Sequence, residues 1–146
     1  MEDTTDMFPV LLIDDEPLVL RVAQALFTRL GFRCDTASRA KDALDLLTSG
    51  SYDIVVADLH MPNIGRYELL EKILQINPDQ NIIIVSGSGV LFQEDIQKHF
   101  GRNIPFLSKP FNVSDILETL RILDITCDAP CTRGNTSKEY PEDFLR

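Results

Sequence analysis

Three aspartates in this sequence come directly after apolar runs that have the composition of buried strands. Asp14 and Asp15 follow the first run, and Asp58 follows a later one. Parallel neighbouring strands would bring these carboxylates to one edge of a sheet, where like charges repel. A hard divalent cation such as Mg²⁺ relieves that repulsion and keeps coordination positions for water or phosphate. The residue types therefore predict metal-assisted phosphate chemistry, with a backbone carbonyl near His60 as a further oxygen ligand.

Two other apolar runs also end in groups that suit a phosphate. Ser86 ends one run, where its hydroxyl can bond a phosphoryl oxygen and the glycine after it lets the backbone come close. Lys109 follows another run, and its ammonium would face the carboxylates and neutralise an added phosphate. Taken alone, Asp14 and Asp15 are equally compatible with capping a helix that begins near Pro17. The four strand ends together favour a single site.

The elements that would position these residues are short strands. The runs 10–13, 54–57 and 82–85 are rich in β-branched residues, which is typical of strands buried on both faces of a parallel sheet. Residues 32–36 alternate in polarity, which indicates a half-buried strand. The run 104–107 contains a proline, which cannot donate to a strand ladder and is confined to sheet edges. The sequence therefore predicts three central strands and two edge strands.

Between the strands, apolar side chains recur at three- and four-residue steps, as they do on one face of a helix. This pattern covers residues 19–30, 40–47, 69–76, 92–100 and 113–120. Asn112 is expected to cap the last helix, with Asp115 in its first turn. Gly31 and Gly50 are expected to close the first two helices.

Strand and helix alternate five times, which implies right-handed crossovers and an open parallel sheet. We predict a flavodoxin-like, doubly wound α/β fold, in which a five-stranded parallel sheet of order 2-1-3-4-5 carries helices on both faces. Ligands bind such sheets at the carboxyl ends of the strands, where the strand order reverses. Residues 1–7 are expected to form a short acidic arm, 8–124 the domain, and 125–146 a polar, mobile tail.

The composition narrows the class of protein. A net charge of −9 argues against direct binding of nucleic acid through phosphate neutralisation. No apolar run approaches the roughly 20 residues that span a bilayer, and the start of the chain lacks the basic residues of a signal peptide. We therefore expect a cytoplasmic location and no insertion into a membrane. Cys34, Cys127 and Cys131 do not make a disulfide framework, and no zinc site is expected.

Four short segments stand in order at the expected strand ends: residues 12–17, 58–62, 86–87 and 109–111. On these segments the sequence resembles the receiver domain of two-component response regulators over about residues 8 to 124. The resemblance implies that Asp58 accepts a phosphoryl group beside Mg²⁺, for which Mn²⁺ can substitute. Asp14 and Asp15 would be the acidic metal pair, completed by Asp58 and by the backbone carbonyl of His60. Lys109 would be the partner of the phosphate.

The resemblance also implies a conformational switch. Ser86 would be the switch hydroxyl and Phe106 the aromatic switch residue, while His60 and Ser88 occupy positions that tune the lifetime of the phosphoryl group. The Lys109-Pro110 bond is expected to be cis. Two residues depart from the family pattern: Arg66 stands where glycine is usual, and Phe106 lacks the hydroxyl of the commoner tyrosine.

The partners that the resemblance implies are a sensor histidine kinase or a phosphotransfer protein as donor, and a downstream protein target. The target would bind the face formed by helix four, strand five and helix five, and a homodimer through this face is left open. The domain is not expected to be an enzyme that turns over an external metabolite. One alternative is a degenerate receiver that only binds proteins. The other is a flavodoxin-like cofactor binder or hydrolase, which would need a glycine- or serine-rich loop where Asp14, Asp15 and Glu16 stand.

Overall fold

The computed structural model of the chain describes residues 9–87, 93–102 and 104–123. The expected acidic arm at residues 1–7 and the expected tail at 125–146, with Cys127 and Cys131, lie outside the described residues. Ser88 also lies outside them.

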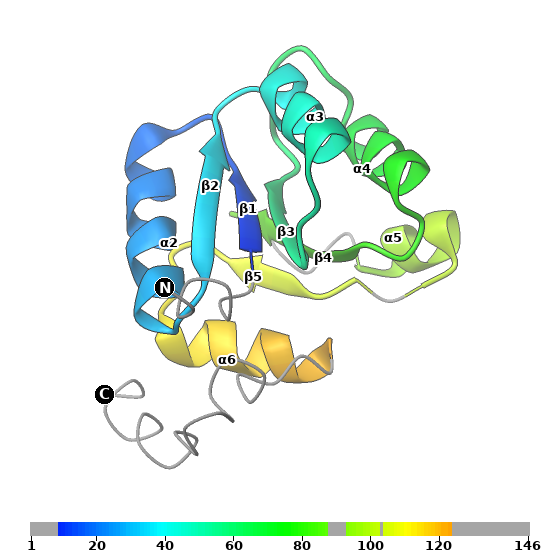
Figure 1. The fold of residues 1–146 in the computed structure, drawn as a ribbon. Coiled ribbons are helices and arrows are strands. Elements are labelled where there is room, and N and C mark those ends of the chain that lie inside the picture. Colours follow the sequence, from blue (N-terminus) through cyan, green and yellow to red (C-terminus); the bar gives the residue numbers. More distant parts are fainter. Residues whose placement is uncertain (1–8, 88–92, 103, 124–146) are drawn as a thin grey trace.

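The described residues form a parallel sheet whose five strands have the spatial order β2-β1-β3-β4-β5 (Figure 1). The order confirms the predicted topology, because β1 and β3 are neighbours although β2 lies between them in the sequence. The strands are β1 Pro9–Ile13, β2 Arg33–Ala37, β3 Ile54–Asp58, β4 Asn81–Ser86 and β5 Phe106–Ser108.

Helices cover both faces of this sheet. Figure 1 shows α2 and α6 on one side and α3, α4 and α5 on the other, as expected for a doubly wound fold. The helices are α2 Pro17–Arg29, α3 Ala40–Ser49, α4 Arg66–Ile76, α5 Gln93–Phe100 and α6 Val113–Ile122. In the part of the chain that the structure describes, no helix is long and apolar enough to cross a membrane.

Alternate side chains of each central strand enter opposite hydrophobic layers. Val10 and Leu12 of β1 join the cluster beneath α2 and α6, whereas Leu11 and Ile13 join the cluster beneath α3, α4 and α5. Side chains of a strand point to opposite faces in turn, so a strand covered on both sides needs apolar residues at every position. This is the reason that the central strands read as continuous apolar runs.

The two edge strands differ from the prediction in detail. β5 begins at Phe106, after Pro105, so the predicted strand 104–107 is shifted by the proline. The Pro105 carbonyl still accepts a hydrogen bond from the Ile84 amide at 2.9 Å, because proline lacks only the donor. In β2 the burial does not alternate regularly, and Cys34 is half-buried against the layer beneath α2.

Most of the predicted helix ends are confirmed. The Asn112 side chain accepts a hydrogen bond from the Asp115 amide at 2.9 Å and caps α6. Gly31 follows the end of α2 with φ of 97°, a left-handed conformation that favours glycine. Gly50 does close α3, but in an extended conformation.

The loop between β3 and α4 makes its turn at an asparagine rather than at a glycine. Asn63 carries the positive φ, at 67°, and asparagine is one of the few side chains that tolerate this region. Gly65 has an ordinary φ of −68° and is the N-cap residue of α4, which begins at Arg66. Glycine is therefore not required at position 66, because the left-handed residue lies three positions earlier.

Candidate functional site

The three aspartates predicted to share a site do meet at one edge of the sheet. Asp14 follows the last residue of β1, and Asp58 is the last residue of β3, with Ile13 of β1 opposite Ala57 of β3. Carboxylate oxygens of Asp14, Asp15 and Asp58 lie within 4.8 Å of one another. Asp14 and Asp58 are each only 3% exposed, whereas Asp15 is exposed. The site is a cluster of acids with one side open to solvent.

Lys109 neutralises the two buried members of this cluster. Its Nζ atom lies 3.0 Å from Oδ2 of Asp14 and 3.1 Å from Oδ2 of Asp58. The lysine follows β5 and is linked to β4 through its backbone, because its amide donates to the Ser86 carbonyl at 3.1 Å. The Lys109-Pro110 peptide bond is cis, as predicted. A strand-end lysine thus reaches across two strands to the carboxylates.

Backbone amides hold the other oxygen of each buried carboxylate. The Glu16 amide donates to Oδ1 of Asp14 at 3.0 Å, and the His60 amide donates to Oδ1 of Asp58 at 2.9 Å. Each carboxylate therefore receives one amide on Oδ1 and the lysine ammonium on Oδ2. This arrangement fixes the orientation of both side chains without any contribution from a ligand.

The helix-capping alternative for Asp14 and Asp15 is wrong. The N-cap residue of α2 is Glu16, and its side chain makes no capping hydrogen bond. Pro17 stands at the start of the helix, as the sequence predicts. The two aspartates precede the helix and face the cluster.

Burial and neighbouring charges shift the pKa values of Asp14 and Lys109. Burial is the main cause that raises the pKa of the Asp14 carboxyl, and the nearby charge of Asp58 raises it further. Burial by itself would lower the pKa of the Lys109 ammonium, but its hydrogen bonds to Asp14 and Asp58 outweigh that effect, and the pKa is raised. The lysine therefore stays charged. Its single positive charge only partly neutralises the two carboxylates that it contacts.

The donor set fits a hard divalent cation. Mg²⁺ takes oxygen ligands and uses one or two carboxylates together with waters and phosphate oxygens. Asp14, Asp15 and Asp58 offer such oxygens. Burial and, to a smaller extent, the charge of Asp58 raise the pKa of Asp14 despite its hydrogen bond to Lys109. A second positive charge at the open side of the cluster would therefore stabilise it.

Of the two predicted switch residues, Ser86 is linked to the cluster through the Lys109 amide, and Phe106 lies on the adjacent strand. Ser86 is 1% exposed at the end of β4, and Phe106 is half-buried at the start of β5. In the register of β4 and β5, Ile84 lies opposite Phe106 and Ser86 lies opposite Ser108. Serine and phenylalanine therefore stand on adjacent strands.

The structure places the His60 side chain close to Asp58, which the sequence alone does not show. Its Nδ1 atom is 3.9 Å from Oδ1 of Asp58, and 53% of the histidine side chain is exposed. Its backbone amide contacts the same carboxylate oxygen. His60 is thus the described side chain, besides Lys109, that brings a nitrogen close to the expected acceptor.

Sequence reasoning gave no role to Glu16, which belongs to the site. Its Oε1 atom lies 3.7 Å from Nζ of Lys109, so this ammonium faces three carboxylates. The signal in the sequence was the third consecutive acid after β1. Glu16 is exposed, and the pair contributes less than the two buried pairs because solvent screens it.

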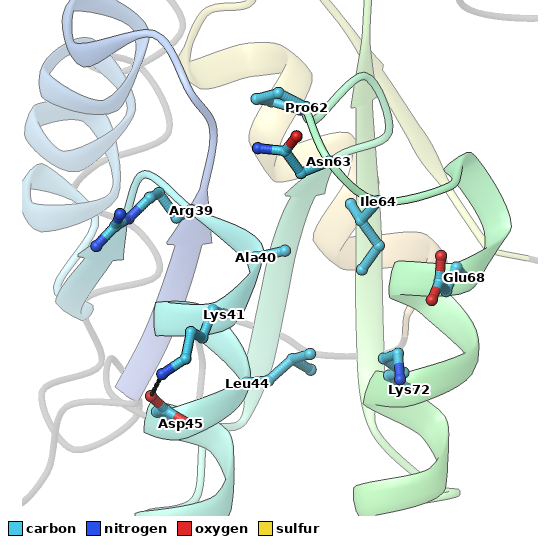
Figure 2. A pocket seen from close by; sticks show the side chains of 10 residues that line it. All are labelled: Arg39, Ala40, Lys41, Leu44, Asp45, Pro62, Asn63, Ile64, Glu68 and Lys72. Carbon is cyan, nitrogen blue, oxygen red and sulfur yellow. Dashed lines mark ion pairs between the residues drawn. The ribbon is translucent and has the colours of Figure 1, made fainter.

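A groove of about 550 Å³ lies between α3 and α4, beneath the loop that leads away from Asp58 (Figure 2). Pro62 and Asn63 of this loop line it, together with Arg39 at the start of α3 and Lys72 of α4. None of the three clustered aspartates lines this groove. The acid cluster and the groove are therefore separate features, and the chemistry belongs to the cluster.

Fold and site together define a class: a doubly wound α/β domain with an acidic cluster and a lysine at its switch point. Residues 10–121 match the family described as the response regulator receiver domain. Because this match covers most of the sequence, the chain belongs to the family of receiver domains that work in two-component systems. The resemblance inferred from the four short segments is confirmed.

Curated relatives agree with this assignment. The sensor histidine kinase RcsC of Escherichia coli strain K12 is 31% identical over 122 residues, which are 84% of this chain and 13% of that protein. The response regulator ArlR of Staphylococcus aureus strain MW2 is 26% identical over 117 residues, which are 80% of this chain and 52% of ArlR. The chain thus spans 13% and 52% of the length of these two relatives.

Solved structures share the fold. A CheY-like receiver domain protein from Methanospirillum hungatei is 23% identical with a TM-score of 0.72, covering 88% of this chain and 99% of that one. The response regulator TrrA from Thermotoga maritima, solved in complex with Mg²⁺-BeF, is 27% identical with a TM-score of 0.70, covering 80% and 99%. The predicted flavodoxin-like architecture is confirmed.

Proposed function

We propose that this domain is a signalling switch that accepts a phosphoryl group on Asp58. A carboxylate oxygen of Asp58 attacks the phosphorus of a phosphohistidine or a small phosphodonor. The bond between phosphorus and the donor atom breaks, and the donor leaves with that electron pair. The feature that supports this proposal is the buried Asp58 carboxylate, which lies between an ammonium and two further acids at the edge of the sheet.

The residues of this chain would contribute positioning and charge. Transfer of a phosphoryl group places negative charge on the equatorial oxygens, and fixed cations stabilise it. Lys109 already lies 3.1 Å from Oδ2 of Asp58 and would move onto a phosphoryl oxygen. The amide of His60 holds the other oxygen of Asp58 and keeps the carboxylate oriented toward the donor.

A metal ion would complete the site. Asp14, Asp15, Asp58 and the backbone carbonyl of His60 would hold Mg²⁺, with Mn²⁺ as a substitute, and the ion would neutralise phosphate charge when bound. In the same proposal, water limits the lifetime of the acyl phosphate, and His60 and Ser88 tune that lifetime. The domain would not turn over an external metabolite.

The output of the switch would run from Ser86 to Phe106. A new phosphoryl dianion would attract the Ser86 hydroxyl, and Phe106 would turn into the vacated space. The face formed by α5, β5 and α6 would then bind a protein target. The phosphodonor would be a sensor histidine kinase or a phosphotransfer protein in the cytoplasm.

Phosphorylation is tested by intact mass spectrometry of the chain after incubation with Mg²⁺ and acetyl phosphate. We expect a gain of one phosphoryl group that hydroxylamine removes, because acyl phosphates react with this nucleophile. Asp58→Asn should abolish the gain. Asp53→Asn is a matched control, since Asp53 precedes the same strand at its opposite end, and it should retain the gain.

Two outcomes would contradict the proposal. A phosphoryl gain that persists in Asp58→Asn would exclude Asp58 as the acceptor. The absence of any gain in the wild-type chain, with Mg²⁺ and excess donor present, would favour the alternative of a degenerate receiver that only binds proteins.

A further inference from the structure

Few of the described side chains of helix α5 are buried against the rest of the domain. Among its described side chains, Ile96 is buried and Phe100 half-buried, whereas Asp95, Gln97, Lys98 and His99 are exposed. A helix with one fully buried residue gains little free energy from burial, so polar contacts to its neighbours weigh more. The position of α5 is therefore sensitive to each contact that remains.

A polar contact between described side chains joins the end of α5 to α4. Nε2 of His99 lies 2.7 Å from Oε2 of Glu71, with 41% and 46% of these side chains exposed. The ring of Tyr67, one turn before Glu71 on α4, lies 5.0 Å from the His99 ring. Tyr67 also meets the Phe100 ring edge to face at 5.9 Å. Tyr67 and Glu71 of α4 thus contact the last two residues of α5.

We propose that His99 and Glu71 form a latch, meaning this pair of side chains, which holds α5 against α4 and opposes the conformational change of the switch face. The inference rests on the proposed function, because the change that the latch opposes is the response to phosphorylation. It assigns a regulatory role to two residues outside the phosphate site.

The latch reaches Phe106 through shared packing. Ile96 belongs to the buried cluster between the sheet and the helices α3, α4 and α5, and Tyr67, Phe100 and Phe106 pack against that same cluster. Phe106 needs room within this layer to turn inward, and packed layers respond to such a demand by moving whole elements. Among the helices of this layer, α5 has the fewest buried side chains in the described residues. We therefore expect α5 to be the helix that moves, and the latch to resist its movement.

The His99 ring can donate a hydrogen bond to the Glu71 carboxylate whether the ring is neutral or charged. A neutral imidazole can donate one hydrogen bond to the Glu71 carboxylate, whereas an imidazolium makes a charge-assisted bond that is roughly twice as strong.

The test measures amide hydrogen exchange of the whole chain in the absence of a phosphodonor. The exchange rates are converted to protection factors, so that differences in intrinsic exchange rate cancel. Glu71→Ala should lower the protection of the α5 amides by about two- to fivefold, the range expected for an exposed pair. Glu71→Gln keeps an acceptor oxygen and should lose less protection than Glu71→Ala. Asp45→Asn is a matched control, because it breaks an exposed pair with Lys41 on α3, and it should leave α5 unchanged.

A second measurement connects the latch to the switch. The concentration of beryllofluoride that gives half of the α5 response should fall about two- to fivefold in Glu71→Ala, since less free energy opposes the change. Exchanging the two residues, in the double variant Glu71→His with His99→Glu, should restore wild-type protection.

Unchanged α5 protection in Glu71→Ala would overturn the latch, as would equal loss of protection in Asp45→Asn. These exchange data need no phosphodonor. A failure of the proposed function would instead be seen as absent mass gain on Asp58 in all variants, so the two failures are distinguishable.

Discussion

Nζ of Lys109 lies 3.1 Å from Oδ2 of Asp58, although 51 positions separate the two residues in the sequence. Both groups are largely removed from solvent, with 21% and 4% of their side chains exposed. The same ammonium contacts Asp14 at 3.0 Å. One lysine thus offsets part of the charge of two buried acids.

Removal of the Lys109 ammonium should therefore have two effects. In Lys109→Met, Asp14 and Asp58 lose their shared cation, and we expect unfolding free energy to fall by about 1–3 kcal/mol. Added Mg²⁺ should recover part of this loss, because it supplies charge to the same acids. Phosphorylation by acetyl phosphate should slow by at least about tenfold, since the variant lacks one fixed cation for the phosphoryl oxygens.

Urea unfolding and intact mass spectrometry measure these two quantities. Lys41→Met is the control, because Lys41 pairs with Asp45 in an exposed position on α3. Lys41→Met should change the unfolding free energy by no more than a few tenths of a kcal/mol, and the phosphorylation rate by no more than about twofold. Equal effects of the two substitutions would show that Lys109 acts only as a surface charge.

Neutralising Asp14 should stabilise the metal-free domain. Folding raises the pKa of this carboxyl, so the native state holds its proton more tightly than the unfolded state. The contribution of Asp14 to stability is therefore greatest below the unfolded pKa and declines as pH rises through the folded pKa. In Asp14→Asn at neutral pH the Tm without metal should rise, while the gain in Tm on adding Mg²⁺ should disappear.

Differential scanning calorimetry with and without Mg²⁺ checks this pair of expectations. Asp42→Asn, at an exposed pair with Arg39, should keep the wild-type response to metal. A metal-dependent gain of normal size in Asp14→Asn would exclude Asp14 as a ligand.

The buried hydroxyl of Tyr52 should stabilise the opposite end of the sheet. It donates to Oδ2 of Asp35 at 2.6 Å, and 8% of the tyrosine is exposed. Tyr52→Phe removes this bond to a charged acceptor, so we expect a loss of about 1.5–3 kcal/mol in urea unfolding at an unchanged m-value. Asp35→Asn keeps one acceptor oxygen and should lose less.

The same tyrosine should make stability depend on alkaline pH. Burial, and then the hydrogen bond to Asp35, raise the pKa of Tyr52 to about 12. The stabilisation is therefore complete below the unfolded pKa near 10 and is lost as pH rises toward the folded value. Lys109 should also contribute a loss of stability as pH rises, because its pKa is raised as well. A profile of unfolding free energy from pH 8 to 11 should fall less steeply in Tyr52→Phe than in the wild type.

The left-handed conformation of Asn63 predicts opposite effects for two substitutions. Asn63 has φ of 67° in the loop that leads from Asp58 to α4. Asn63→Val should cost about 1–2 kcal/mol, since a β-branched side chain is strained there, whereas Asn63→Gly should be neutral or stabilising. Thermal unfolding of both variants distinguishes them. Equal stability of the two would contradict the strained conformation.

Parts of the fold could be predicted because they depend on local pattern. The central strands are continuous apolar runs that end in polar residues, and the ends of α2 and α6 carry Gly31 and Asn112, residues that suit those positions. The start of β5 could not be predicted from the position of Pro105, because this proline still accepts a hydrogen bond through its carbonyl. The turn before α4 could not be read from its glycine, since Asn63 takes the left-handed role.

The sequence by itself determined that acids, a hydroxyl and a lysine follow strand-like runs, and that all of them belong to one edge of a parallel sheet. It did so because strand ends and side-chain period are local properties of the chain. Only the tertiary structure decided which oxygens the ammonium of Lys109 contacts, that Glu16 joins them, and that His99 reaches Glu71 from another helix. Such distances depend on how packed elements are oriented relative to one another, and that orientation results from the whole core rather than from any one segment.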